Sequence, residues 1–157
     1  MSKKFISERI QIKPDPKYPD MLTTKFINCL MWQGKKSVAQ QVFYEAMDIV
    51  AKKIKETAPL EVFLTAVNNV KPMLEVRSRR VGGASYQVPM QVSPRRQQSL
   101  AIRWIIAAAR AKKGKPMGDR LAGELMDAFN KEGAAISTRE NVHRMAEANK
   151  AFAHFAW

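Results

Sequence analysis

Residues 70–104 read VKPMLEVRSRRVGGASYQVPMQVSPRRQQSLAIRW, and the architecture follows from how this stretch differs from its flanks. On either side, apolar residues recur at helical spacing, whereas here the sequence alternates with a period of two, which is typical of strands. Gly82-Gly83 predicts a turn, and Ser93-Pro94 predicts the start of a new helix. We therefore expect a two-stranded ribbon, residues 73–92, set between helices. The stretch contains one acid, Glu75, and seven cations: Lys71, Arg77, Arg79, Arg80, Arg95, Arg96 and Arg103.

Two strand registers are possible for this ribbon. A two-residue loop would pair Val81 with Ala84, whereas a three-residue loop, Val81-Gly82-Gly83, would pair Arg80 with Ala84. We expect the second register, because it divides the apolar side chains and the arginines cleanly between the two faces. An isolated hairpin is marginal in water, so we expect this one to gain its order from a polyanion. An ordinary solvated surface hairpin is the alternative.

The composition is that of one basic domain. The chain has 157 residues, 46% of them hydrophobic, with 27 basic and 14 acidic side chains, a net charge of +13 and a pI near 10.1. Such a charge favours a polyanionic partner, either nucleic acid or an anionic membrane surface. The single cysteine, Cys29, predicts a reducing compartment without an intrachain disulfide, and its apolar neighbours favour a core position. With no signal peptide and no apolar run of membrane-spanning length, we expect a soluble protein of the cytoplasm or of an organelle matrix.

The sequence predicts a mainly α protein with about six helices in a bundle, the ribbon between the third and fourth helices, and an extended basic N-terminal arm. The arm, residues 1–19, contains three prolines that oppose a helix, and it is either a disordered tail or a strand that orders on RNA. Helix starts are indicated by Asp20, Ser37, Ser93 and a capping box at 137–140. The expected helices cover about 21–32, 38–55, 59–69, 94–110, 118–131 and a C-terminal helix that, with its aromatic tail, makes up 137–157.

The sequence indicates neither an enzyme nor a metal site. Glu140 and His143 have the Glu-x-x-His spacing of di-iron bundles, but such a site needs a second copy and two further carboxylates. A surface histidine one turn from a capping glutamate explains the pair better. Residues 34–37, GKKS, lack the spacing and the second glycine of a phosphate-binding loop. We therefore expect no catalysis, no cofactor and no metal.

Three stretches carry a family resemblance: GKKSVAQQVFYEAM at 34–47, the ribbon stretch at 70–104, and RMAEANKAFAHFAW at 144–157. They are similar to the bacterial-type small-subunit ribosomal protein seven family. The resemblance implies a six-helix bundle with a protruding ribbon, and early binding to the 3′ major domain of small-subunit ribosomal RNA that initiates assembly of the head. It also implies a ribbon near exit-site transfer RNA and messenger RNA, and contacts with neighbouring head and platform proteins. A location in the ribosome, of the cytoplasm or of an organelle, follows, with no membrane and no homo-oligomer.

The resemblance and the positions of the basic side chains define two sets of candidate residues. The ribbon residues expected near transfer RNA and messenger RNA are Arg77, Arg79, Arg80, Val81, Gly82, Gly83 and Tyr86. The residues expected to bind ribosomal RNA are Lys3, Lys4, Arg9, Lys35, Lys36, Lys71, Arg95, Arg96, Arg103, Arg110, Lys112, Lys113 and Lys115. The N-terminal arm departs from the dense arginine-lysine cluster of the family, because Phe5-Ile6-Ser7-Glu8 interrupts its basic run.

The predicted function is that of a structural RNA-binding protein. We expect its affinity to come from phosphate contacts and to depend strongly on salt, and its selectivity to come from the shape of a folded RNA junction. One alternative is a free RNA-binding regulator that represses translation of its own operon. Others are a regulator of messenger RNA or DNA that places a helix in a groove, and a binder of anionic membranes.

Overall fold

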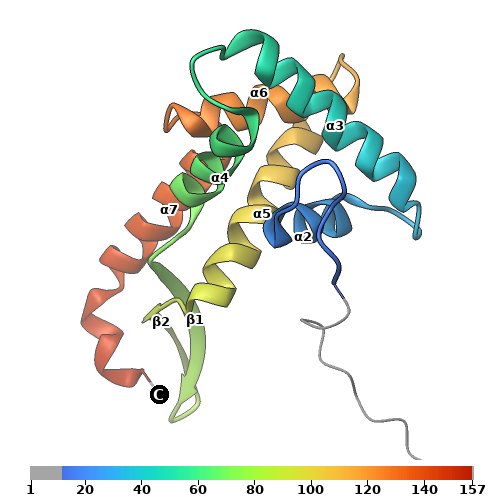
Figure 1. Cartoon of the computed structure of the whole chain (residues 1–157). Helices are drawn as coiled ribbons and strands as arrows, with labels where there is room; N and C mark the ends of the chain where they lie inside the picture. Colours follow the sequence, from blue (N-terminus) through green and yellow to red (C-terminus); the bar gives the residue numbers. More distant parts are fainter. Residues whose placement is uncertain (1–11, 157) are drawn as a thin grey trace, which may run out of the picture.

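The computed structural model describes residues 12–156. The elements in this range are α2 (Met21–Leu30), α3 (Lys36–Lys53), α4 (Pro59–Val70), β1 (Leu74–Val81), β2 (Ala84–Gln91), α5 (Pro94–Ala111), α6 (Met117–Phe129), α7 (Ala134–Ala148) and the 3-10 helix η1 (Lys150–Phe155). The predicted mainly α fold with one ribbon between α4 and α5 is confirmed. Figure 1 shows that the helices form a body and that the ribbon projects from it beside α7 and the start of α5.

The core is filled by side chains that α2 to α7 turn inward. Phe26, Phe43 and Phe63 are fully buried, and their ring centroids lie 5.6, 5.2 and 5.3 Å apart. Tilted and edge-to-face aromatic pairs of this kind contribute about 0.5–1.5 kcal/mol each beyond the burial of their area. Trp104 packs against the same core, as the sequence predicted. The result is a rigid body on which α2 and α5 are fixed relative to each other.

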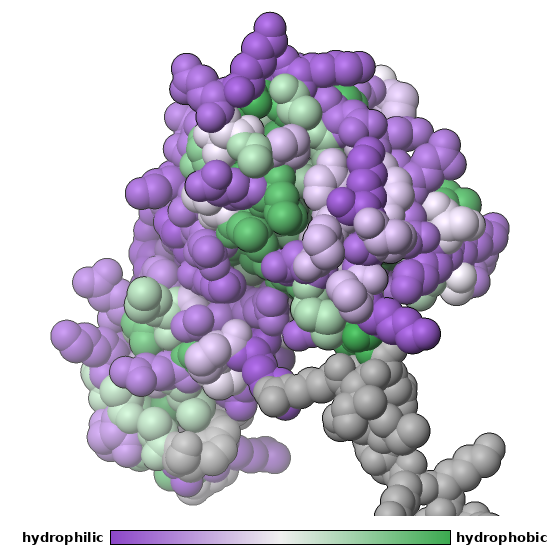
Figure 2. All heavy atoms as spheres, in the orientation of Figure 1, coloured by the Kyte–Doolittle hydropathy of each residue, from purple (hydrophilic) through white to green (hydrophobic). Residues whose placement is uncertain are grey.

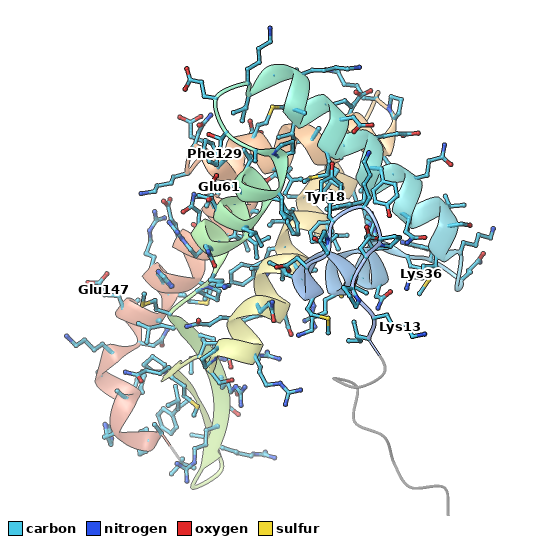
Figure 3. All side chains as sticks on the ribbon, in the orientation of Figure 1. Lys13, Tyr18, Lys36, Glu61, Phe129 and Glu147 are labelled. Atoms are coloured by element: carbon cyan, nitrogen blue, oxygen red, sulfur yellow. The ribbon has the colours of Figure 1, made fainter. Side chains whose placement is uncertain are left out.

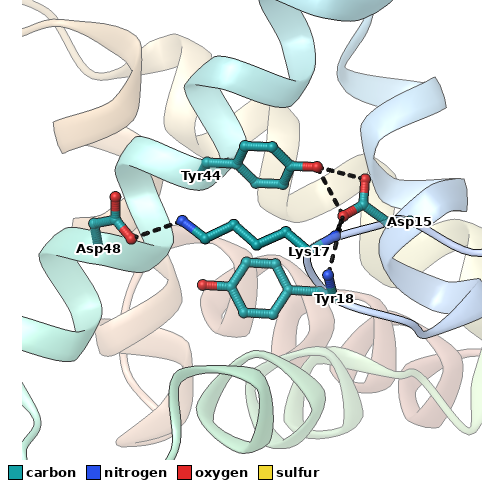
Figure 4. Close-up of polar contacts among 5 residues, drawn as sticks. All are labelled: Asp15, Lys17, Tyr18, Tyr44 and Asp48. Carbon is teal, nitrogen blue, oxygen red and sulfur yellow. Dashed lines mark hydrogen bonds and ion pairs between the residues drawn. The ribbon is translucent and has the colours of Figure 1, made fainter.

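The segment before α2 is fastened to this body by Asp15, whose buried carboxylate is shown in Figure 4. Hydrogen bonds of 2.8–3.2 Å reach it from the Tyr44 hydroxyl, the Gln40 amide and the backbone N–H groups of Lys17 and Tyr18. Burial raises the pKa of Asp15, but these hydrogen bonds outweigh that effect and hold the pKa below its ordinary value. Burial and the Asp15 carboxylate together raise the pKa of Tyr44 to about 12.

Residues 12–19 of the predicted extended arm are neither a disordered tail nor a segment that needs RNA to become ordered. Residues 12–19 contain no helix, as their prolines predicted, but they pack against α3 through Asp15 and through the Tyr18 ring, whose centroid lies 6.1 Å from that of Phe43. The predicted first half, residues 1–11, lies outside the described residues.

The ribbon has the two-residue loop, so the predicted register is wrong. Ala84 pairs with Val81 and not with Arg80. The φ angles are +58° at Gly82 and +86° at Gly83. Two successive positive φ values are what a type I′ turn needs, and this turn matches the right-handed twist of paired strands. Glycine adopts such values without steric cost, so the Gly-Gly pair favours the tighter loop.

The observed register places one face of the ribbon against the C-terminal part of the chain. The Tyr86 ring centroid lies 5.3 Å from that of Phe152 and 5.0 Å from that of Phe155. On the same face, the Arg79 guanidinium donates a hydrogen bond to the Phe155 carbonyl, and Val88 is fully buried. The ribbon is thus not an isolated hairpin, and the inference that it needs a polyanion to become ordered loses its basis.

The predicted N-cap residues are correct for α2 and α5 but not for α3. Ser93 is the N-cap residue of α5, as predicted, although its side chain makes no capping hydrogen bond. Ser37 does not cap α3, because this helix begins at Lys36 without any side-chain cap. Asp20 caps α2 as predicted, since its carboxylate accepts a hydrogen bond of 2.6 Å from the Leu22 N–H.

The start of α7 corrects the predicted boundary at residue 137. The helix begins at Ala134, so Ser137 lies inside it and the capping box does not form. The cap comes instead from a neighbouring helix: the buried Glu124 carboxylate of α6 accepts a hydrogen bond of 2.9 Å from the Ala135 N–H. A buried acceptor from another helix satisfies the orphan N–H groups of a first turn as well as a local serine does.

Candidate nucleic-acid interface

A groove with a volume of about 670 Å³ runs between α2 and α5, and we call it the α2–α5 groove. Ile102 and Ile106 of α5 lie along it and are buried. Basic side chains line it from both helices, and no acidic residue is among the described residues that line it. The α5 residues recur every three or four positions, so they share one face of that helix. The four cations of the groove are Lys25 from α2 and Arg95, Arg103 and Arg110 from α5.

Two of these four cations are open to a ligand. Arg95 and Arg103 are exposed, and within residues 12–156 no ion pair or hydrogen bond engages their guanidinium groups. Lys25 has its Nζ 3.5 Å from an amide oxygen of Gln98, and Arg110 donates a hydrogen bond of 3.2 Å to the Leu30 carbonyl. A positive groove without acidic neighbours attracts the phosphate groups of a nucleic acid.

Cys29 lines the α2–α5 groove and is exposed, so the predicted core position is wrong. It lies beside the buried Phe26 and Leu30 on α2, at the edge of the face that these two residues turn to the core. Desolvation by the groove raises the pKa of its thiol, and the nearby charge of Arg103 offsets this only in part. As the only cysteine of the chain, Cys29 is a natural probe of whether the groove is occupied.

Glu75 organises the base of the ribbon, where β1 meets the start of α5. Its Oε1 lies 2.6 Å from Nε of Arg77, and its Oε2 lies 3.0 Å from Nε of Arg96. Burial raises the pKa of Glu75, but the hydrogen bonds from Arg96 and Arg77 outweigh it and lower the pKa overall. The two arginines are therefore held by the protein itself, with part of each guanidinium still exposed.

The remaining candidate residues of the ribbon divide between its two faces. Arg79 and Tyr86 are half-buried by their contacts with η1. Arg80 points to the opposite face and is exposed, as are Gly82 and Gly83 of the loop, whereas Val81 is half-buried. The structure thus brings Arg80 and the glycine tip to solvent and places Arg79 and Tyr86 against the chain's own C-terminal part.

The other basic candidates lie in connections. Lys35 and Lys36 are exposed at the start of α3, and Lys113 and Lys115 are exposed between α5 and α6. Lys112 is engaged, because its Nζ lies 2.8 Å from Glu124 and 3.0 Å from Asp127. Lys71 is also engaged, since its Nζ donates to the Asn68 amide oxygen at 2.6 Å. The predicted contacts Lys3, Lys4 and Arg9 lie outside the described residues.

The charges are unevenly placed around the body. Figure 3 shows Lys13 and Lys36 on the side where the N-terminal segment enters, and Glu61 and Glu147 on the side of α4 and α7. Figure 2 shows that hydrophilic side chains cover most of the face it presents, with apolar ones gathered near its middle. The two labelled lysines and the two labelled glutamates thus lie on different sides of the molecule.

Sequence reasoning missed two residues of this region. Lys25 follows Met21 by one turn on the outer side of α2, and only the packing of α2 beside α5 shows that it faces the groove. Trp32 is 63% exposed, and the Arg110 Cζ lies 5.0 Å from its ring centroid. The exposure of Trp32 could have been predicted from its position directly before the polar turn Gln33-Gly34, because an apolar side chain next to a surface turn has few core residues to pack against.

Among the described residues, no group of three or more potential ligands is placed to hold a metal ion. His143, the histidine of the Glu-x-x-His spacing, instead accepts a hydrogen bond of 3.0 Å from the Met73 N–H at the base of the ribbon. Burial lowers the pKa of His143, and the charge of Arg139 lowers it further. His143 thus acts as a neutral acceptor that ties α7 to the start of β1.

We expect the stability of this contact to fall as the pH drops below about 6.5. The pKa of His143 is lower in the folded chain than its ordinary value of 6.5, so the unfolded chain binds more protons in this window. The stabilisation is fully present above pH 6.5 and is lost as the pH falls through the folded value, on the order of 1 kcal/mol for one hydrogen bond. Amide exchange at Met73 between pH 7.5 and 5.5 measures it, after correction for intrinsic exchange rates.

The matched variant for this test is His143→Gln, whose side-chain oxygen accepts a hydrogen bond without titrating. Protection of the Met73 amide should be pH-independent in this variant over the same range. An equal loss of protection in both proteins would show that another group controls the base of the ribbon.

None of the helices in the described residues is long and apolar enough to cross a membrane.

The family model described as ribosomal protein S7p/S5e matches residues 2–150 of this chain. The small ribosomal subunit protein uS7 of Rhodopirellula baltica is 61% identical over 98% of this chain and 99% of its own length. The uS7 proteins of Thermotoga neapolitana and Bartonella henselae are 60% and 55% identical, over 96% and 100% of this chain and 97% and 100% of their own lengths.

Proposed function

The chain belongs to the ribosomal protein S7p/S5e family and is a structural, non-enzymatic component of the small ribosomal subunit, and from this premise we propose that it is a primary RNA-binding protein of that subunit. It binds the 3′ major domain of small-subunit ribosomal RNA and nucleates assembly of the head. The observation that carries the proposal is the α2–α5 groove, where Arg95 and Arg103 are exposed without an acidic neighbour among the described lining residues. Its location is the ribosome, as the sequence predicted.

The length of the groove suits the backbone of folded RNA. Arg95 and Arg110 are separated by 15 positions of one helix, which corresponds to about 22 Å along the helix axis. Cations spread over this length reach several successive phosphates and place the chain on the RNA without reading its bases. Selectivity then comes from the shape of a junction that presents its phosphates along the same path, because the deep groove of A-form RNA hides the base edges.

The ribbon has a separate role in this proposal. Its exposed residues Arg80, Gly82 and Gly83 lie near exit-site transfer RNA and messenger RNA, while the groove holds ribosomal RNA. Glycines at the tip let a backbone approach closely, because they carry no side chain. The outer side of α7 and η1 faces neighbouring head and platform proteins.

The test is an equilibrium titration of the full chain at physiological salt. Three ligands of equal length are compared: the 3′ major domain junction of small-subunit ribosomal RNA, a duplex RNA and a duplex DNA. We expect the junction to bind at least about 100-fold more tightly, a difference of about 2.7 kcal/mol. Equal affinity for all three ligands would mean that the charge of +13 acts as a non-specific polyanion surface, and the proposed role in RNA recognition would fail.

A further inference from the structure

Trp32 is the most exposed of the large apolar side chains at the basic side of the molecule, with 63% of its surface accessible. It follows the last residue of α2 by two positions and precedes two residues with left-handed backbone, Gln33 with φ +51° and Gly34 with φ +73°. A non-glycine residue with positive φ costs free energy. The turn is nevertheless well defined, because the Lys35 N–H donates a hydrogen bond of 2.9 Å to the Trp32 carbonyl.

The Trp32 ring is also held from the side of α5. The Arg110 Cζ lies 5.0 Å from its ring centroid, within the range of a cation–π interaction. The same guanidinium donates to the Leu30 carbonyl at 3.2 Å, so its position is fixed by the end of α2. The exposed indole is therefore contacted by an arginine whose own position is set by the end of α2.

Beside this ring lies a hollow of about 440 Å³, which we call the Trp32 hollow. Its walls are mostly apolar, and its basic members are Lys35, Arg110 and Arg120. No acidic residue is among the described residues that line it. Val38 in its wall is 55% exposed although it is aliphatic, so the hollow leaves apolar surface uncovered in the isolated chain. The apolar lining consists of Leu30, Trp32, Val38, Ala39, Val42 and Met117.

The chemistry of the Trp32 hollow selects a ligand that is flat and apolar on its faces and that carries negative charge at its edge. An unpaired nucleobase with its flanking phosphates has these properties, and such bases stack on aromatic rings and on arginine guanidinium planes. An apolar side chain of a protein would fill the hollow but would leave the exposed Lys35 without a counter-charge. The hollow also shares Arg110 with the α2–α5 groove, so a strand of RNA that follows the groove reaches it directly.

We propose that Trp32 and Arg110 form a stacking site for one unpaired nucleobase of the bound RNA, with the exposed Lys35 contacting a flanking phosphate. This inference rests on the proposed RNA-binding function and adds a single-stranded element to what the groove recognises. A junction with a base extruded at the right distance from the groove is then preferred over one in which every base is paired.

The test compares two variants, Trp32→Leu and Trp32→Tyr, by titration of the full chain with the 3′ major domain RNA. The side chain is exposed, so neither change is expected to disturb the fold, and thermal melting checks this. Stacking on an aromatic ring is a main contribution to the binding of an unpaired base. We therefore expect Trp32→Leu to bind at least about fivefold more weakly, which is about 1 kcal/mol, whereas Trp32→Tyr stays close to the wild type because it keeps an aromatic ring.

Two further readouts separate stacking from a loss of charge or shape. The dependence of affinity on salt should be unchanged in Trp32→Leu, because no phosphate contact is lost. Quenching of tryptophan fluorescence on RNA binding should be larger in the wild type than in Trp32→Phe. Undiminished affinity of Trp32→Leu, with the junction preference intact, would overturn the stacking site alone. An equal loss in the leucine and tyrosine variants would also overturn it, whereas failure of the wild type to prefer the junction would overturn the proposed function itself.

Discussion

Replacing Arg95 and Arg103 together with glutamine is expected to weaken binding to the 3′ major domain RNA by about 100-fold at physiological salt. Both side chains line the α2–α5 groove and are exposed. Within residues 12–156 neither is engaged by an acid, so their loss removes ligand contacts without breaking the fold. Hydrogen bonds to charged groups are worth about 1.5–3 kcal/mol each, and two at the lower end of this range account for about 100-fold.

The salt dependence of binding gives this prediction a second readout. Each phosphate contact contributes about 0.7–0.9 to the slope of log affinity against log salt concentration, so the slope should fall by roughly 1.4–1.8 in the double variant. The matched control is Lys52→Gln with Lys53→Gln at the end of α3, which removes the same charge from exposed positions outside the groove. A similar loss of affinity in the control would mean that total charge, and not the groove, drives binding.

The thiol of Cys29 reports where the RNA lies. It lines the same groove and is the only cysteine of the chain, so bound RNA should slow its alkylation. Burial raises the pKa of this thiol and Arg103 opposes that effect, so the Arg103 variant also changes the thiolate fraction. The rates are therefore compared with and without RNA within each protein, at one alkaline pH. Alkylation that is unaffected by saturating RNA would place the RNA elsewhere.

Replacing Glu124 with alanine is expected to lower the free energy of unfolding by about 3 kcal/mol, the lower end of what removing one partner of a buried ion pair costs. Glu124 is fully buried. Its Oε2 lies 2.8 Å from the Lys112 Nζ, and its Oε1 accepts a hydrogen bond of 2.9 Å from the Ala135 N–H. The change therefore removes an ion pair, the cap of α7 and packed volume at one position. Lys112 keeps Asp127 as a partner at 3.0 Å, so the loss in the free energy of unfolding stays at the lower end of the range for a broken ion pair.

Urea unfolding followed by circular dichroism measures this loss. Glu124→Gln keeps the acceptor for Ala135 but removes the charge, so it should retain part of the stability that alanine loses. Glu147→Ala is the matched control, because it removes an exposed glutamate from α7 and should change stability by less than about 0.5 kcal/mol. Equal effects of Glu124→Ala and Glu147→Ala would contradict the view that Glu124 joins α5, α6 and α7.

Much of the fold could be predicted from the sequence, because helices and strands leave a periodic apolar pattern. The six helices, the ribbon between α4 and α5, and the caps at Asp20 and Ser93 were all found in this way. The two failures have different causes. The capping box predicted at residue 137 does not form, because Glu124, which is 11 residues from Ala135 in sequence, caps α7 instead. The register failed for a local reason, since the positive φ values of Gly82 and Gly83 favour the two-residue loop.

The candidate site shows a similar division. The sequence identified Arg95, Arg103 and Arg110, since these belong to an obvious surplus of positive charge. It could not tell an exposed cation from an engaged one, because Lys112 and Arg96 differ from their neighbours only in the carboxylates that the fold places beside them. It also missed Lys25, whose relevance depends entirely on the packing of α2 beside α5.

The contact between the ribbon and η1 has a consequence for synthesis of the chain. Arg79 and its acceptor Phe155 are 76 residues apart. At about 5–20 residues per second on a translating ribosome, roughly 4–15 s separate their emergence. During that interval both strand segments have been synthesised but the aromatic rings of η1 that cover Tyr86 have not, so Tyr86 lacks this cover in the nascent chain. Packing of η1 against the ribbon is therefore a late folding event. It takes place only in a chain that has been translated through Phe155, and not in one whose translation has stalled before that residue.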